Sequence, residues 1–212
     1  MNTQHTYIRR EKAMRLLDLF LVSVLIFSGC SNDNITVPVI SSKSIEGSSV
    51  QSYFHLAVGD TLVYSQTHLL VVENTALINS KTYYGVTGFP IGAAVPMDFY
   101  IRQDEKGDVY AVYEDGLSLL YKTDSENGET WVTDIFGKSV TFKMESREDT
   151  VTTSFATFTN CLRIRIQYDW FEYERHWLAP NVGIVQREFF TLSLRPVWAF
   201  DLILTDARLK KQ

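Results

Sequence analysis

The side chains that most often carry chemistry are few and scattered in this sequence. After residue 30 the histidines are His55, His68 and His176, and none has the spacing of a metal-binding motif. No Gly-x-Ser-x-Gly turn presents a serine nucleophile, and no glycine-rich loop is built to hold a phosphate. No two acidic residues stand out as a glycosidase pair. The sequence therefore predicts no catalytic residues, no metal site and no cofactor.

One aromatic segment has the composition of a binding surface. Trp170, Phe171 and Tyr173 lie in the run Asp-Trp-Phe-Glu-Tyr-Glu, in which the sequence indicates a turn among acids. Exposed aromatic rings offer a large apolar face to a ligand or partner. We predict these three residues as a candidate surface for a glycan or a protein. The alternative is that they pack in the core, as we expect for most of the other aromatic residues.

The two cysteines, Cys30 and Cys161, lie in different surroundings. Cys161 opens the apolar run Cys-Leu-Arg-Ile-Arg-Ile, which predicts a small buried side chain and not a reactive thiol. Cys30 ends the uncharged stretch 19–30, which is too short to span a bilayer because a span takes about 20 apolar residues. A basic segment, a short apolar run and small residues form the layout of a secretory signal. The basic residues before the run are Arg9, Arg10, Lys12 and Arg15.

The end of this stretch, Phe27-Ser28-Gly29-Cys30, resembles the lipobox of bacterial lipoproteins, with Phe27 where most members have leucine. The resemblance implies cleavage before Cys30 and acylation of its sulfur and its new amino group, with palmitate among the acyl chains. Two or three acyl chains anchor a protein stably to a membrane. Ser31 follows the cysteine in place of the aspartate that retains some lipoproteins at the inner membrane. This favours the outer membrane, if the organism has one. The alternative is an ordinary cysteine in a cleaved signal or in an anchor helix.

Composition bounds the classes of function. Cleavage before Cys30 would leave 183 of the 212 residues, about the size of one domain. Loss of four basic and two acidic residues would change the formal charge from −5 to −7. An acidic protein of this kind is a poor ligand for nucleic acid and for anionic lipid headgroups. With Cys161 as its single remaining cysteine, the exported domain must be stabilised by its core and not by an internal disulfide.

The remaining sequence predicts a tether followed by one β domain. We expect a signal peptide at 1–29, a lipidated N-terminus and flexible serine-rich tether at 30–51, and a single domain at 52–212. Within the tether, residues 35–40 are apolar enough to add an edge strand. Val140, Phe142 and Met144 alternate with polar residues, and so do Leu162, Ile164 and Ile166. We predict an all-β fold, an antiparallel and strongly curved sheet or open barrel built from successive hairpins.

Three segments of this domain resemble a widespread, functionally uncharacterised family of secreted and lipid-anchored bacterial β domains. They are His-Leu-Ala-Val-Gly-Asp-Thr-Leu-Val-Tyr at 55–64, Val-Thr-Thr-Ser-Phe-Ala-Thr-Phe-Thr-Asn-Cys-Leu at 151–162, and Trp-Leu-Ala-Pro-Asn-Val-Gly-Ile-Val-Gln-Arg-Glu at 177–188. The chain departs from the family pattern at four positions, which are His55, Leu62, Ser154 and Ala156. The resemblance implies a fold and a compartment, and it brings no activity and no catalytic residues.

Three functional hypotheses follow from these observations. The first is a membrane-anchored lipoprotein that acts as a non-catalytic binding or structural module of the cell envelope, without nucleic acid and as a monomer. The second is a carrier or chaperone whose curved sheet shelters an apolar ligand. The third is a hydrolase of envelope polymers. A filled core would favour the first, an open apolar cavity the second, and acids that converge in a cleft the third.

Overall fold

The computed structural model describes residues 39–40, 51–65, 68–91, 97–113, 116–135, 137–168, 172–191 and 197–210. Three residues singled out above, Cys30, Trp170 and Phe171, lie outside the described residues. No helix in the described ranges has the length and apolar character needed to cross a bilayer.

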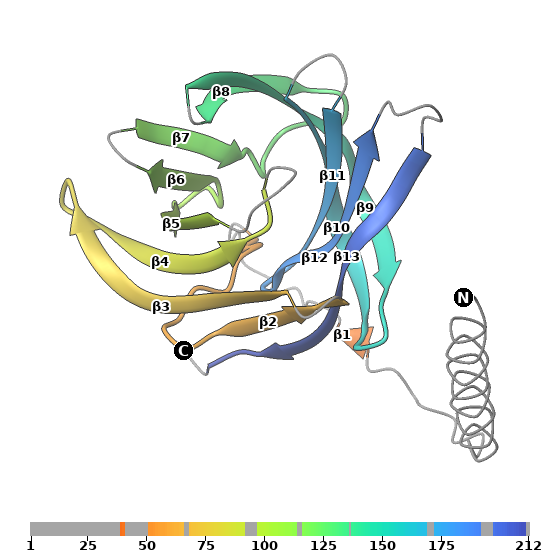
Figure 1. The fold of residues 1–212 in the computed structure, drawn as a ribbon, viewed down its shortest axis with the longest axis horizontal. Helices are drawn as coiled ribbons and strands as arrows, with labels where there is room; N and C mark the ends of the chain where they lie inside the picture. Colours follow the sequence, from red (N-terminus) through yellow and green to blue (C-terminus); the bar gives the residue numbers. More distant parts are fainter. Residues whose placement is uncertain are drawn as a thin grey trace, which may run out of the picture. The chain divides into compact units, whose positions relative to one another are not determined.

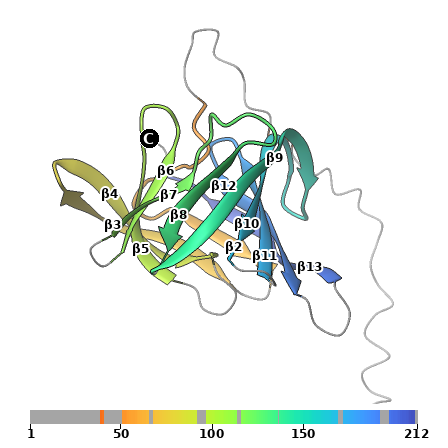
Figure 2. The same ribbon diagram turned by 90° about the horizontal axis from the view of Figure 1, so that it is seen from above.

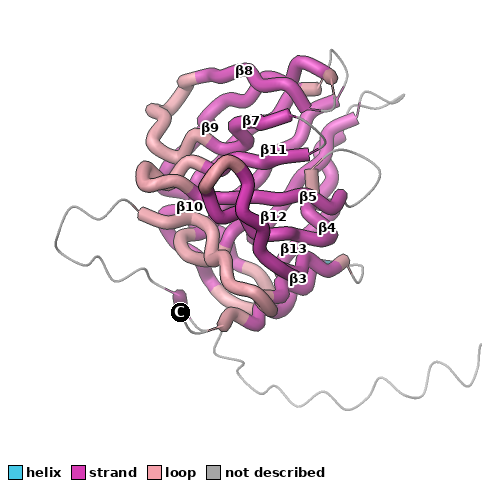
Figure 3. Tube along the Cα trace, turned by 90° about the vertical axis from the view of Figure 1, so that its left-hand side faces the viewer, coloured by secondary structure: helices cyan, strands magenta, loops and turns pink. Residues whose placement is uncertain are grey.

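The described ranges fold almost entirely as β-strands (Figures 1 and 3). The strands are β1 (Val39–Ile40), β2 (Thr61–Tyr64), β3 (Leu69–Ile78), β4 (Lys81–Phe89), β5 (Met97–Gln103), β6 (Val109–Tyr113), β7 (Gly116–Tyr121), β8 (Thr130–Ile135), β9 (Lys138–Thr152), β10 (Thr157–Gln167), β11 (Glu172–Ala179), β12 (Gly183–Thr191) and β13 (Val197–Arg208).

All strands belong to one sheet of order β7-β6-β5-β4-β3-β2-β13-β12-β11-β10-β9-β8, and β1 pairs with the start of β10. Every neighbouring pair along this path is antiparallel, and the β1–β10 pair is parallel. The sheet curls until its two edge strands, β7 and β8, lie beside each other (Figures 1 and 2). There the hydroxyl of Ser118 donates to the backbone carbonyl of Asp134. The predicted all-β class with a strongly curved antiparallel sheet is confirmed.

The tight turns follow from residues that tolerate positive φ. Asn79 and Ser80 have φ values of 49° and 61°, and they form the two-residue loop between β3 and β4. Gly88 shows a different requirement, because a Cβ at this position would lie 2.0 Å from the carbonyl oxygen of Leu69. β4 thus approaches the backbone of β3 more closely than any side chain would permit.

The polar and apolar alternation seen in the sequence separates the two faces of the sheet. Val140, Phe142 and Met144 of β9 are completely buried, as are the three alternating apolar residues of β10. Side chains alternate across a strand, so the polar residues between them lie on the opposite face. The predicted inward set of these two strands is confirmed.

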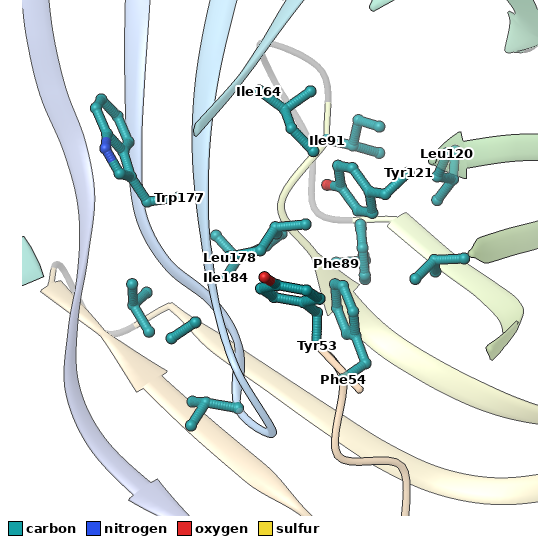
Figure 4. Packing of buried hydrophobic residues seen from close by; sticks show 14 of the residues in the cluster. Tyr53, Phe54, Phe89, Ile91, Leu120, Tyr121, Ile164, Trp177, Leu178 and Ile184 are labelled. Atoms are coloured by element: carbon teal, nitrogen blue, oxygen red, sulfur yellow. The ribbon is translucent and has the colours of Figure 1, made fainter. Parts of the chain in front are cut away.

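Aromatic side chains pack inside the curve. The segment before β2 brings in Tyr53 and Phe54, and Phe54 stacks on Phe89 and Tyr121 at centroid distances of 6.1 and 5.7 Å. These rings lie together between the two halves of the sheet (Figure 4). The backbone N–H of Asn181 donates to the carbonyl of Ser52 over 2.9 Å, which fastens this segment to the β11–β12 turn. The concave face is therefore covered by the chain's own residues.

The short strand β1 falls within the segment predicted as a tether. Val39 and Ile40 pair with Thr157 and Phe158, which lie at the start of β10. They belong to the stretch 35–40 that the sequence indicates as an added strand. Apart from these two residues and Gln51, the segment 30–51 lies outside the described ranges.

Candidate functional site

Three polar side chains meet in the buried interior and form what we call the Tyr–His–Glu chain, which consists of Tyr121, His176 and Glu174. Glu174 and His176 are two positions apart on β11, so both point to the inner face of the sheet. Both are completely buried. Nδ1 of His176 lies 2.7 Å from the Tyr121 hydroxyl on β7, and Nε2 of His176 lies 2.9 Å from Oε2 of Glu174.

Two further groups surround the carboxylate of Glu174. The hydroxyl of Tyr168 donates to its Oε2 over 3.2 Å, and Nη1 of Arg187 lies 3.9 Å from its Oε1. This Oε1 accepts no hydrogen bond from the described residues. The carboxylate is thus held between an imidazole and a guanidinium, with one oxygen left incompletely satisfied in the core.

The order of hydroxyl, imidazole and carboxylate is that of the triads that activate nucleophiles. A neutral His176 fits the distances if Nε2–H donates to Glu174 and Nδ1 accepts from Tyr121. Burial, and after it the charge of Glu174, raise the pKa of Tyr121 well above its ordinary value of 10.0. The hydroxyl therefore keeps its proton, and the Tyr121 side chain is closed to solvent. We assign the Tyr–His–Glu chain a structural role.

The sequence did not reveal this chain of hydrogen bonds. It indicated a turn among acids at Trp170 and Phe171, and it did not indicate that Glu174, which lies inside β11, faces the core. The available signal was the spacing Glu174-x-His176-x-Leu178, which places two polar residues on the same face as a buried leucine. The partner Tyr121 is 55 positions away from His176, and no local pattern joins them.

Ion pairs cover the outer face of β9 to β12. Nε of Arg175 lies 2.8 Å from Glu145 and its Nη1 lies 3.6 Å from Glu188. Nη1 of Arg163 lies 3.1 Å from Asp149. The arginine side chains of these pairs are 27–36% exposed, and their acidic partners are 12–20% exposed. This face is a well-neutralised polar surface.

Of the predicted aromatic surface, only Tyr173 lies in the described ranges. It is half-buried on β11, with the guanidinium of Arg165 4.1 Å above its ring and the ring of Phe190 5.7 Å away. With Trp170 and Phe171 outside the described residues, the binding surface stays a prediction.

The other two histidines lie apart from the Tyr–His–Glu chain. Nδ1 of His55 lies 2.6 Å from Asp60, whose carboxylate also accepts the backbone N–H of Lys210 over 2.7 Å. Nε2 of His68 lies 2.7 Å from the carbonyl oxygen of Gly88. In the part of the chain that the structure describes, no group of three His, Cys, Asp or Glu side chains is arranged to hold a metal ion.

Cys161 is completely buried, which confirms its predicted character as a small core residue. Burial, with a smaller effect from the charge of Asp149, raises the pKa of its thiol from 9.0 to about 12. The thiolate is the reactive form of cysteine. At neutral pH this residue is therefore an inert part of the core.

A polar groove of about 520 Å³ lies where the ends of β4, β5 and β6 meet. Register places Arg102 of β5 opposite Tyr110 of β6, and the Arg102 guanidinium lies 4.4 Å from the Tyr110 ring centroid. Nε of Arg102 donates to the hydroxyl of Tyr83 over 3.2 Å. The full lining consists of Lys81, Thr82, Arg102, Gln103, Asp104, Glu105, Lys106 and Tyr110.

Comparison with known proteins identifies no family for this chain. No protein-family model matches it, and no curated protein matches it. A structure from Bacteroides fragilis, provisionally described as an exported protein with a YmcC-like fold, is 13% identical, with a TM-score of 0.45, and the match covers 74% of this chain and 99% of that one. A second, from Parabacteroides distasonis and provisionally described as a lipoprotein, is 12% identical, with a TM-score of 0.43 and the same coverage. At TM-scores below 0.5, neither likeness bears on what this chain binds or does.

Proposed function

We propose that the protein is a lipid-anchored, non-catalytic binding or structural module of the cell envelope, held at the membrane by acyl chains on Cys30. The observation that carries the non-catalytic part is the burial of the described side chains on the inner face of the sheet. Phe54, Phe89 and Tyr121 occupy the concave side of the sheet, and the Tyr–His–Glu chain has no access to solvent. An activity in such a domain belongs to its outer surface.

The two alternatives fit the described residues less well. A carrier needs apolar space inside the curve, and there the rings of Tyr53 and Phe54 already pack. An apolar ligand would have to displace the segment before β2 from its contacts with the β11–β12 turn. A hydrolase needs reactive side chains that a substrate reaches, and the one hydroxyl–imidazole–carboxylate arrangement described above is sealed.

Labelling with an alkyne analogue of palmitate in the producing cells tests the anchor. The wild-type chain should incorporate the label and fractionate with the outer membrane, where the organism has one. The Cys30→Ala variant should accumulate as an unlabelled precursor. Cys161→Ala is the matched control, since it removes the other cysteine and should be labelled like the wild type. Equal labelling of Cys30→Ala and the wild type would exclude Cys30 as the acylation site.

Mass spectrometry of the purified native protein tests the rest of the proposal. The expected result is the mass of the acylated chain with no apolar compound bound in stoichiometric amount. A stoichiometric lipid or other apolar molecule that survives purification would favour the carrier over the module.

A further inference from the structure

The groove at the ends of β4, β5 and β6 contains Arg102, whose guanidinium is oriented by the fold but still has hydrogen-bond donors available for a ligand. Ile101 is buried in the core, so its neighbour Arg102 lies on the outer face of the sheet. There Arg102 is flanked by two tyrosines, with its guanidinium 4.4 Å from the Tyr110 centroid and 5.6 Å from the Tyr83 centroid. Nε donates to Tyr83, whereas neither terminal nitrogen donates a hydrogen bond to any described residue.

The other lining residues divide into those that build the groove and those that remain available. Asp104 accepts the backbone N–H groups of Lys106 and Asp108, and Gln103 donates to the carbonyl of Gly107, so both hold the β5–β6 turn. The remaining side chains form no hydrogen bond or ion pair with the described part of the chain; they are Lys81, Thr82, Glu105 and Lys106. The groove therefore offers a fixed guanidinium, two ammonium groups, a hydroxyl and a carboxylate to a ligand.

These groups define the chemistry of the ligand. The edge formed by the two terminal nitrogens of Arg102 can bind a planar oxyanion in bidentate fashion, and stacking on tyrosine keeps the guanidinium oriented before the ligand arrives. The three cations and two anions of the lining give it a formal charge of +1, in a protein whose formal net charge is −5. Asp104 and Glu105 would repel a dianion such as phosphate more strongly than a monoanion.

We propose that this groove binds a small carboxylate that also carries hydroxyl groups, of the kind found in sugar acids. Arg102 binds the carboxylate through its guanidinium, and Lys81 and Lys106 add positive charge at the rim. Thr82 and Glu105 hydrogen-bond the hydroxyl groups. The volume of about 520 Å³ lies in the range of small-molecule sites, roughly 300–1,000 Å³.

Isothermal titration of the purified full-length chain in detergent with sodium glucuronate tests the proposal. We expect saturable binding with a Kd of about 1 mM, and no measurable binding of glucose, which lacks the carboxylate. Arg102→Gln should weaken glucuronate binding about tenfold or more, because a hydrogen-bonded charged pair is lost. Arg102→Lys should weaken it to a similar degree, because lysine keeps the charge but not the planar fork.

Arg208→Gln is the matched control, since Arg208 is an exposed arginine at the far end of β13 and its loss changes the net charge equally. It should bind glucuronate like the wild type. Thermal melts that match the wild type show that the variants are folded. The proposal is overturned if glucuronate does not bind, if Arg102→Gln or Arg102→Lys binds it as tightly as the wild type, or if glucose or inorganic phosphate binds as well as glucuronate.

This inference gives the proposed binding module a site and a ligand class, and the titration can fail independently of the lipid anchor. Absence of palmitate labelling would leave the groove on β4 to β6 unchanged. Absence of glucuronate binding would leave the anchor at Cys30 unchanged.

Discussion

Replacing His176 with leucine tests whether the buried charge of Glu174 depends on the imidazole. Glu174 is completely buried, and His176 is its shortest contact, at 2.9 Å. The remaining contacts, Tyr168 at 3.2 Å and Arg187 at 3.9 Å, are longer. Removing a buried hydrogen bond to a charged group costs about 1.5–3 kcal/mol. For a domain of this size we therefore expect a fall in Tm of about 3–12 °C.

Urea unfolding of the full-length chain, followed by tryptophan fluorescence, measures this free energy. His68→Leu is the control, because His68 makes a single side-chain bond to the backbone carbonyl of Gly88 and should cost about 1 kcal/mol. Adding Glu174→Gln to His176→Leu removes the buried charge that has lost its hydrogen bond to the imidazole, so the double variant should be more stable than His176→Leu alone. The reasoning fails if His176→Leu costs no more than His68→Leu, or if the second substitution lowers stability further.

Three further predictions concern the core, a turn and the domain boundary. The raised pKa of Cys161 means that the unfolded chain loses the thiol proton at lower pH than the folded chain. The contribution of this thiol to the stability of the folded state is therefore complete below about pH 9 and is lost between pH 9 and about 12. Between pH 8 and 10.5 Cys161→Ala should therefore lose about 2 kcal/mol less stability than the wild type, and equal losses in urea unfolding would contradict the shift. Gly88→Ala should destabilise the domain by more than about 2 kcal/mol, because its Cβ would meet the Leu69 carbonyl at 2.0 Å, whereas Gly128→Ala, at φ +90° with open space, should cost about 1 kcal/mol. Residues 52–212 should form a soluble monomer with a β-type circular dichroism spectrum and a cooperative melt; a β spectrum without a cooperative melt would mean that β1 is needed to complete the sheet.

The strands and their inward faces were predictable because they depend on local pattern. Alternation in β9 and β10 identifies Val140 and Ile164 as buried, and the pair Asn79-Ser80 marks its own turn. The sequence predicted that the sheet is strongly curved, but not how its strands pair to produce the curve. The sequence does not contain the register that returns β13 to β2 through Leu204 and Tyr64. That pairing joins segments about 140 residues apart, and local propensity carries no information over such a distance.

The groove on β4 to β6 was beyond sequence reasoning for a related reason. Tyr83 and Tyr110 appeared as strand aromatics, for which burial in the core is the usual expectation. Arg102 does not belong to any sequence motif that would mark it as a binding residue. Only the cross-strand register brings the arginine between the two rings, on the face opposite Ile101. The site is a property of pairing between strands and not of any one segment.

The Tyr–His–Glu chain bears on how the sheet curves as well as on how stable the domain is. Tyr121 is on the edge strand β7, whereas His176 is on β11, and the two strands are not neighbours in the sheet. Their 2.7 Å hydrogen bond therefore spans the interior and holds one half of the curled sheet at a fixed distance from the other. Apolar contacts such as that of Phe54 with Phe89 fix the distance between strands less tightly than a hydrogen bond does. We infer that the buried polar bridge selects one curvature among several that apolar packing alone would permit. On this hypothesis His176→Leu broadens the urea transition, with a lower m-value, in addition to shifting it, and a shifted transition of unchanged slope would refute it.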